Sequence, residues 1–135
     1  MRIAFGTDER TELTAAIVAD LREGGHDVVV VGEGGPWPDV GRAVGQAVAG
    51  GGVERGIVCC WTGTGVSIAA NKVGGIRAAL CTDAETARGA RRWNDANVLA
   101  LGLRLTSREV AREMVEAFLA TDPDVEEKEN VAKLG

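Results

Sequence analysis

Apolar runs and helix-like patterns alternate along the chain. Several of the apolar runs are continuous, which is typical of strands that are covered on both faces of a parallel sheet. Between them, apolar residues recur every three or four positions, as on the buried face of a helix. The predicted strands are Arg2–Gly6, Asp27–Val31, Arg55–Cys60, Arg77–Cys81 and Val98–Leu101. The predicted helices are Glu12–Glu23, Asp39–Ala49, Val66–Lys72, Ala84–Trp93 and Arg108–Ala120.

This alternation predicts an α/β fold. Right-handed strand–helix–strand crossovers join parallel strands, so we expect a Rossmann-like three-layer sandwich with a five-stranded parallel sheet. The length of 135 residues fits a single domain, 1–135. The final segment, Asp122–Gly135, is acidic and predicts either a short exposed helix or a C-terminal arm that reaches a partner subunit.

Composition excludes several classes of function. The formal net charge of −5 argues against a general nucleic-acid-binding protein. No apolar run approaches the roughly 20 residues of a membrane helix, and Met1–Phe5 is too short for the apolar core of a signal peptide. The three cysteines, two of them adjacent, make a poor disulfide framework, so we expect a cytoplasmic protein. One histidine and no CxxC spacing predict no metal site and no cofactor.

Candidate chemistry gathers at the predicted carboxyl ends of the strands, where ligands bind in open α/β sheets. Cys60 ends a strand there and is followed by a loop of small residues, Gly63–Gly65, whose N–H groups can bind an anion. The loop lacks the pattern of a dinucleotide site or a P-loop. A thiol base beside an anion hole is suited to moving a proton next to a carbonyl group. The same edge should carry Thr7–Arg10, Thr82–Asp83 and Gly102–Arg104.

Several of these residues also have a purely structural interpretation. Cys60 can be a small buried hydrophobic residue, as Cys59 is expected to be. Asp8 can orient a sugar hydroxyl or cap the first helix. The tryptophans Trp37, Trp61 and Trp93 can cover the core or form the walls of a ligand pocket.

Arginines on the fourth predicted helix are expected to be exposed. Arg88, Arg91 and Arg92 follow one another closely enough to form a solvated helix face. One of them can still reach an anion bound at the predicted site.

Five blocks of sequence, spread in order over the chain, carry a resemblance. They are Gly6–Asp8, Pro36–Asp39, Cys60–Val73, Gly75–Cys81 and Asn94–Gly102. Together they resemble the ribose-5-phosphate isomerase B and galactose-6-phosphate isomerase family. The resemblance implies a Rossmann-like homodimer, sometimes a dimer of dimers, with active sites at the subunit interface. It also implies metal-free aldose–ketose isomerisation of a small sugar phosphate through a cis-enediol(ate).

The resemblance also implies roles for individual residues. Cys60 matches the base that moves the proton, and Thr62 matches a hydroxyl near the substrate oxygens. Asp8 and Asn94 match groups that bind substrate hydroxyls, and Arg104 matches an arginine that contacts phosphate. The amides that match the enediolate hole belong to the segment Gly63, Thr64, Gly65, Val66 and Ser67.

The chain departs from the family pattern around the expected pocket. Glu9 replaces the histidine of the N-terminal Asp-His pair, and Trp93 replaces the histidine that opens the sugar ring. Trp37 stands in place of a tyrosine and Trp61 in place of a glycine. The arginines of the C-terminal phosphate clamp are replaced by Glu126, Glu129 and Asn130. We therefore expect retained proton transfer, with altered ring opening, altered phosphate binding and a smaller or flatter pocket.

These departures suggest a short substrate. A tetrose 4-phosphate has no free hydroxyl with which to close a furanose, so it needs no ring-opening acid. Erythrulose/erythrose 4-phosphate interconversion is the first hypothesis, with ribose 5-phosphate/ribulose 5-phosphate as the other substrate pair. Arg10, with Arg104 or Arg88, would bind the phosphate. The alternatives are an isomerase of an unphosphorylated sugar and a non-catalytic protein that binds a ligand.

Overall fold

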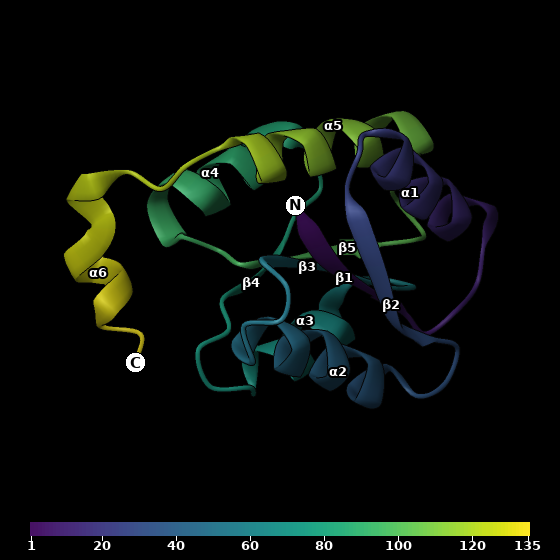
Figure 1. Cartoon of the computed structure of the whole chain (residues 1–135), viewed down its shortest axis with the longest axis horizontal. Coiled ribbons are helices and arrows are strands. Elements are labelled where there is room, and N and C mark those ends of the chain that lie inside the picture. The colour runs from purple at the N-terminus through teal and green to yellow at the C-terminus, as the bar shows by residue number, and fades with distance from the viewer.

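The computed structural model describes residues 1–135, arranged in three layers. The parallel sheet has five strands in the order β2-β1-β3-β5-β4. Figure 1 shows α1, α4 and α5 on one face of the sheet and α2 and α3 on the other. The strands are β1 Arg2–Thr7, β2 Asp27–Glu33, β3 Arg55–Cys60, β4 Ala78–Leu80 and β5 Val98–Gly102. The helices are α1 Glu12–Glu23, α2 Trp37–Ala49, α3 Thr64–Asn71, α4 Ala84–Asn94, α5 Arg108–Ala120, the 3₁₀ helix η1 Val125–Glu127 and α6 Lys128–Ala132.

The predicted α/β architecture is confirmed, but two helices begin earlier than predicted. Helix α2 begins at Trp37, because Pro38 fits the first turn, where its missing N–H needs no partner. Helix α3 begins at Thr64, directly after Gly63, which adopts a left-handed conformation with φ of 81°. Thr64 and Gly65, expected in a loop, therefore form the first turn of a helix.

Strand alternation divides the core into two clusters, one under each helical layer. Ile57 and Cys59 of β3 face the cluster that includes residues of α1, α4 and α5. Val58 and Cys60 face the cluster that includes residues of α2 and α3. Adjacent residues of a strand point to opposite faces, so the two neighbouring cysteines lie on opposite sides of the sheet.

One arginine was predicted wrongly. Arg91 was expected on a solvated helix face, but it is only 1% exposed. Its Nε donates to the carbonyl oxygen of Thr121 at 3.0 Å, and its guanidinium lies 5.8 Å from the ring centroid of Phe118. The side chain therefore ties the end of α4 to the end of α5 from inside the protein.

The C-terminal segment forms two short helical pieces, η1 and α6, with no buried residue. Arg92 anchors their start, because its Nε and Nη2 lie 3.2 and 3.1 Å from the two carboxylate oxygens of Asp124. The Asp124 N–H also donates to the carbonyl oxygen of Arg92 at 2.8 Å. None of the helices in the chain combines the length and the apolar character needed to cross a membrane.

Candidate active site

The carboxyl ends of β1, β3 and β5 meet at one edge of the sheet. Thr7 pairs with Cys59 across β1 and β3, and Cys60 pairs with Gly102 across β3 and β5. The residues that follow these three strands therefore start side by side, as the sequence predicted.

Cys60 is the one cysteine of the β3 pair that reaches solvent. It is 6% exposed, whereas Cys59 is fully buried at 0%. Burial raises the pKa of the Cys59 thiol, which makes that thiol a poor base. Cys81 is also buried, and burial together with Asp83 raises its pKa to about 11. Among the three thiols, Cys60 is the most exposed.

A helix N-terminus without a side-chain cap follows Cys60. Gly63 is the N-cap of α3, and no side chain accepts a hydrogen bond from the first turn. The Ser67 N–H makes a helical bond to the carbonyl oxygen of Gly63 at 3.2 Å, so the amide of Ser67 is engaged. The N–H groups of Thr64, Gly65 and Val66 have no acceptor within the helix. At the positive end of the helix dipole these three N–H groups could bind an anion, and we refer to them as the anion hole.

Two glycines allow this loop to lie against the end of β5. A Cβ on Gly63 would come within 2.8 Å of the Leu101 carbonyl carbon, and a Cβ on Gly102 within 2.7 Å of the Thr62 oxygen. The backbone continues this contact, because the Arg104 N–H donates to the carbonyl oxygen of Trp61 at 2.9 Å. Arg104 is thereby fixed next to the loop that follows Cys60.

Two threonine hydroxyls lie at the anion hole. The Oγ1 atoms of Thr62 and Thr64 are 2.9 Å apart, and either can be the donor. Both residues are exposed, so the pair can exchange its mutual hydrogen bond for bonds to a ligand.

Asp8 carries an acceptor without a partner. Its Oδ1 is buried and has no hydrogen bond, while its N–H donates to the carbonyl oxygen of Cys59 at 3.3 Å. Burial, and then the charge of Glu9, raise the pKa of this carboxyl group. Helix α1 is capped by Thr11, so the capping role considered for Asp8 is wrong. A buried acceptor left unpaired costs about 1–3 kcal/mol, which a ligand hydroxyl could offset.

Arg10 and Glu9 lie beyond the end of β1. Arg10 Nη2 is 3.1 Å from Glu33 Oε2, and both side chains are partly exposed. Our sequence reasoning missed Glu33, because the predicted second strand stopped at Val31. The strand instead continues to Glu33, which pairs with Thr7 at the same edge of the sheet. The carbonyl of Glu9 accepts a hydrogen bond from Thr7 Oγ1 at 2.7 Å, and its side chain is exposed.

Two of the three tryptophans flank the anion hole. Trp61 directly follows Cys60 and is 55% exposed. Trp37 packs on the first turn of α3, since a Cβ on Gly65 would lie 2.9 Å from its ring. Trp37 also lines a groove of about 400 Å³ between α2 and α3, together with Ile68 and Lys72.

Trp93 and Asn94 do not join this group within one chain. They end α4, which runs back to the amino end of the sheet, and β5 begins only at Val98. The carbonyl of Asn97 accepts a hydrogen bond from the N–H of Gly56, near the start of β3. At roughly 3.3 Å per residue, the length of β5 places the two groups about 15 Å apart or more. Trp93 packs instead on Gly89 of its own helix.

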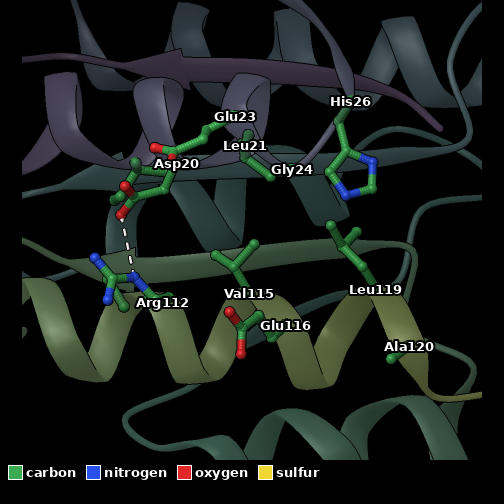
Figure 2. A pocket seen from close by; sticks show the side chains of 12 residues that line it. Asp20, Leu21, Glu23, Gly24, His26, Arg112, Val115, Glu116, Leu119 and Ala120 are labelled. Atoms are coloured by element: carbon green, nitrogen blue, oxygen red, sulfur yellow. Dashed lines mark ion pairs between the residues drawn. The ribbon is translucent and has the colours of Figure 1, made fainter.

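A separate cavity of about 610 Å³ lies between α1 and α5. Figure 2 shows Asp20 and Arg112 toward one end of it and His26 and Leu119 toward the other. It contains none of the predicted site residues. No group of three or more His, Cys, Asp or Glu side chains in the chain is arranged to bind a metal ion.

Comparison with known protein families identifies the family of this chain. A family model described as Ribose/Galactose Isomerase matches residues 3–134. The chain belongs to the ribose/galactose isomerase family. The resemblance found in the sequence blocks is therefore confirmed.

Relatives within the ribose/galactose isomerase family are named after different substrates. Ribose-5-phosphate isomerase B of Escherichia coli is 45% identical over 87% of this chain and 83% of its own length. D-erythrulose-4-phosphate isomerase of Pectobacterium atrosepticum is 40% identical over 88% of this chain and 82% of its own length. A solved structure of Clostridium thermocellum ribose-5-phosphate isomerase B covers all of this chain with a TM-score of 0.93, at 41% identity and 95% coverage of that protein. The predicted enzyme class, an aldose–ketose isomerase, is confirmed.

Proposed function

We propose that this protein interconverts the aldose and ketose forms of a small sugar phosphate through a cis-enediolate, with Cys60 as the base. The observation that carries the proposal is the position of Cys60. It is the last residue of β3, it is 6% exposed where Cys59 is 0% exposed, and the uncapped N-terminus of α3 follows it at Gly63.

The proposed reaction has two proton transfers. The Cys60 thiolate removes the proton from the carbon beside the substrate carbonyl, and the electron pair of that C–H bond forms the C=C bond of the enediolate. The carbonyl oxygen becomes an oxyanion, which the N–H groups of Thr64, Gly65 and Val66 stabilise. The thiol then returns the proton to the neighbouring carbon, while a proton passes between the two oxygens near Thr62. These N–H groups stabilise the oxyanion without a metal ion.

We further propose that the working enzyme is a homodimer in which each site uses residues of two chains. Cys60 lies at the carboxyl end of the sheet, while Trp93 and Asn94 lie at the amino end. One chain cannot bring both groups to one substrate, but a second copy can. The three free cysteines fit a reducing cytoplasm.

The favoured substrate is an open-chain tetrose phosphate, erythrulose or erythrose 4-phosphate. Support comes from Trp93, which stands where the resemblance places the histidine that opens a sugar ring. A relative named D-erythrulose-4-phosphate isomerase, 40% identical to this chain, is consistent with such a substrate. Ribose 5-phosphate is the competing substrate, since it gives its name to another relative.

Arg104 is the best-placed cation for the phosphate. It forms no ion pair in the chain, and its backbone is bonded to Trp61 beside the anion hole. Arg10 can assist if the phosphate displaces Glu33, because exposed ion pairs contribute only about 0–1 kcal/mol. A well-placed arginine–phosphate contact contributes about 1.5–3 kcal/mol.

A second candidate is an isomerase of an unphosphorylated sugar. Glu33 already forms an ion pair with Arg10. In addition, the acidic residues Glu126 and Glu129 replace arginines of the family's phosphate clamp. These carboxylates would repel a phosphate. A non-catalytic, ligand-binding role is the third candidate, and the arrangement of Cys60, Thr62 and the anion hole argues against it.

A substrate panel with paired cysteine variants tests the proposal. Wild-type protein is assayed on tetrose, pentose and hexose phosphates and on the unphosphorylated sugars. Cys60→Ala should abolish turnover, whereas Cys59→Ala should retain it. Efficient turnover of ribose 5-phosphate with none on tetroses would overturn the tetrose version. Competition by inorganic phosphate separates the phosphorylated from the unphosphorylated case, and no turnover on any sugar would favour the binding role.

A further inference from the structure

The turn between α4 and β5 contains the only residue other than glycine with a positive φ. This residue is Asp95, with φ of 47° and ψ of 44°. Its N–H donates to the Arg91 carbonyl at 3.2 Å, and the next N–H, from Ala96, donates to the Ala90 carbonyl at 3.0 Å. Asp95 therefore ends helix α4 in the left-handed conformation, at a position that is usually glycine. An aspartate at this position carries a backbone cost that glycine would avoid.

The Asp95 carboxylate is held by two arginines from different elements. Oδ1 lies 2.8 Å from Arg91 Nη1, and Oδ2 lies 3.3 Å from Arg77 Nη2. Arg77 Nε also donates to the Asp95 carbonyl oxygen at 2.7 Å. The Arg91 side chain is 2% exposed and donates through Nη1 to the carbonyl oxygen of Ala96 at 2.6 Å. The backbone cost at Asp95 is therefore accompanied by two carboxylate contacts, with Arg91 and Arg77, that glycine could not make.

Asn97 fixes the other side of the same turn. Its Oδ1 accepts the backbone N–H of Arg77 at 2.8 Å, and its Nδ2 donates to the carbonyl oxygen of Gly75 at 3.0 Å. The turn is thus tied to the segment before β4 as well as to the end of α5. The two residues that immediately precede Asp95 are Trp93 and Asn94.

We propose that Asp95 is a positioning residue of the active site, which holds the turn that presents Trp93 and Asn94 to the Cys60 cleft of a second copy of the chain. This inference rests on the proposed function, in particular on the shared site. A turn needed only to end α4 would be better served by glycine, which would place no charge between Arg77 and Arg91.

Two substitutions separate the charge from the turn. Asp95→Asn keeps the size of the side chain and tolerates the left-handed conformation, while Asp95→Gly favours that conformation outright. Both should lower kcat on the panel substrate about tenfold or more, because small misplacements of a site residue are costly. Asp20→Asn is the matched control, since Asp20 also pairs with two arginines, Arg108 at 2.8 Å and Arg112 at 3.6 Å, but lies on α1. Asp20→Asn should leave kcat unchanged, and an unchanged kcat in both Asp95 variants would overturn the inference.

Mixed dimers show in which site Asp95 acts. A chain with Cys60→Ala is co-refolded with an equal amount of a chain with Asp95→Asn. Each mixed dimer then has one intact site, composed of Cys60 from the second chain and the native turn from the first. Half of the dimers are mixed and each has one good site of two, so activity should return to about a quarter of the wild-type value. Activity that stays at the average of the two parent variants would overturn the inference, because Asp95 would then act within its own chain.

A second mixture distinguishes the proposed role of Asp95 from the proposed site shared between two chains. Cys60→Ala is mixed with Asn94→Ala, which tests the shared site without Asp95. Recovery here with no recovery for Asp95→Asn overturns only the role of Asp95. Recovery in neither mixture overturns the shared site, and the role of Asp95 with it.

Discussion

The indole ring of Trp37 lies against Gly65, so closely that a Cβ on Gly65 would be 2.9 Å from Cε3 of the ring. Gly65 lies in the first turn of α3, and its N–H group belongs to the proposed anion hole. Trp37 therefore packs on the turn that supplies the proposed donors, and the two residues limit each other's size.

Gly65→Ala should damage the site more than the fold. The new methyl group pushes the exposed Trp37 ring outward, at a cost of about 1 kcal/mol in the free energy of unfolding. We expect kcat/KM to fall about tenfold, because the methyl group and the Trp37 ring displace the turn that supplies the proposed anion hole. Urea unfolding and steady-state kinetics measure the two effects. Gly74→Ala is the control, since a Cβ there meets no atom within 4 Å, and Trp37→Leu should partly restore the activity of Gly65→Ala.

The three cysteines should differ sharply in reactivity. In native protein at pH 8, iodoacetamide should modify Cys60 alone, since Cys59 and Cys81 are 0% and 1% exposed. The pKa of Cys81, raised to about 11, leaves only about one thiol in a thousand ionised at that pH. Peptide mass spectrometry identifies the modified residue. Labelling of Cys59 before Cys60 would contradict the strand orientation described above.

Arg91 should contribute more to stability than its neighbours on α4. Arg91→Ala removes a buried guanidinium that donates to the carbonyl oxygens of Thr121 and Ala96, and we expect a loss of about 1.5–3 kcal/mol in the free energy of unfolding. Arg88→Ala is the control on the same helix. Its pair with Glu85 is exposed, and its loss should cost less than about 0.5 kcal/mol. Equal losses in urea unfolding would show that Arg91 is not the anchor of the α4–α5 contact.

Asp8 should make the protein less stable as the pH rises. Its pKa is raised in the folded state, mainly by burial, so the folded chain binds this proton more tightly than the unfolded chain. The resulting stabilisation is complete below the ordinary carboxyl pKa of about 4 and is lost as the pH rises through the folded pKa. Asp8→Asn should remove this loss, so its stability relative to wild type should increase between pH 4 and pH 7.

Asp83 provides a comparison of opposite sign for that pH series. Its carboxylate accepts the Thr86 N–H at the start of α4, which lowers its pKa. This stabilisation is present above the ordinary carboxyl pKa and is lost as the pH falls through the folded pKa. Relative to wild type, Asp83→Asn should therefore become less stable as the pH rises. Parallel curves for the two variants would contradict the environment assigned to Asp8.

The sequence was sufficient to predict the sheet and the edge at which the chemistry gathers. Continuous apolar strands and the carboxyl-end rule placed Cys60, Asp8 and Arg104 together, because these depend on local pattern and topology. The role of Arg91 could not be predicted, since a charged residue on a helix gives no sign that it will donate to the buried carbonyl oxygens of Thr121 and Ala96. Glu33 was missed because strand length depends on pairing with β1. The separation of Trp93 from Cys60 follows from the direction of α4, and bringing them together requires a second chain.

The adjacent thiols of β3 have a consequence for the way this chain can change. A slip of one residue in the register of β3 against β1 and β5 would turn Cys59 toward α3 and place Cys60 beneath α5. The two sulfur atoms are chemically identical, so the sheet alone selects the one that meets the loop. An insertion or deletion within β3 would therefore exchange the proposed catalytic thiol for its neighbour and keep a sulfur atom at the same edge.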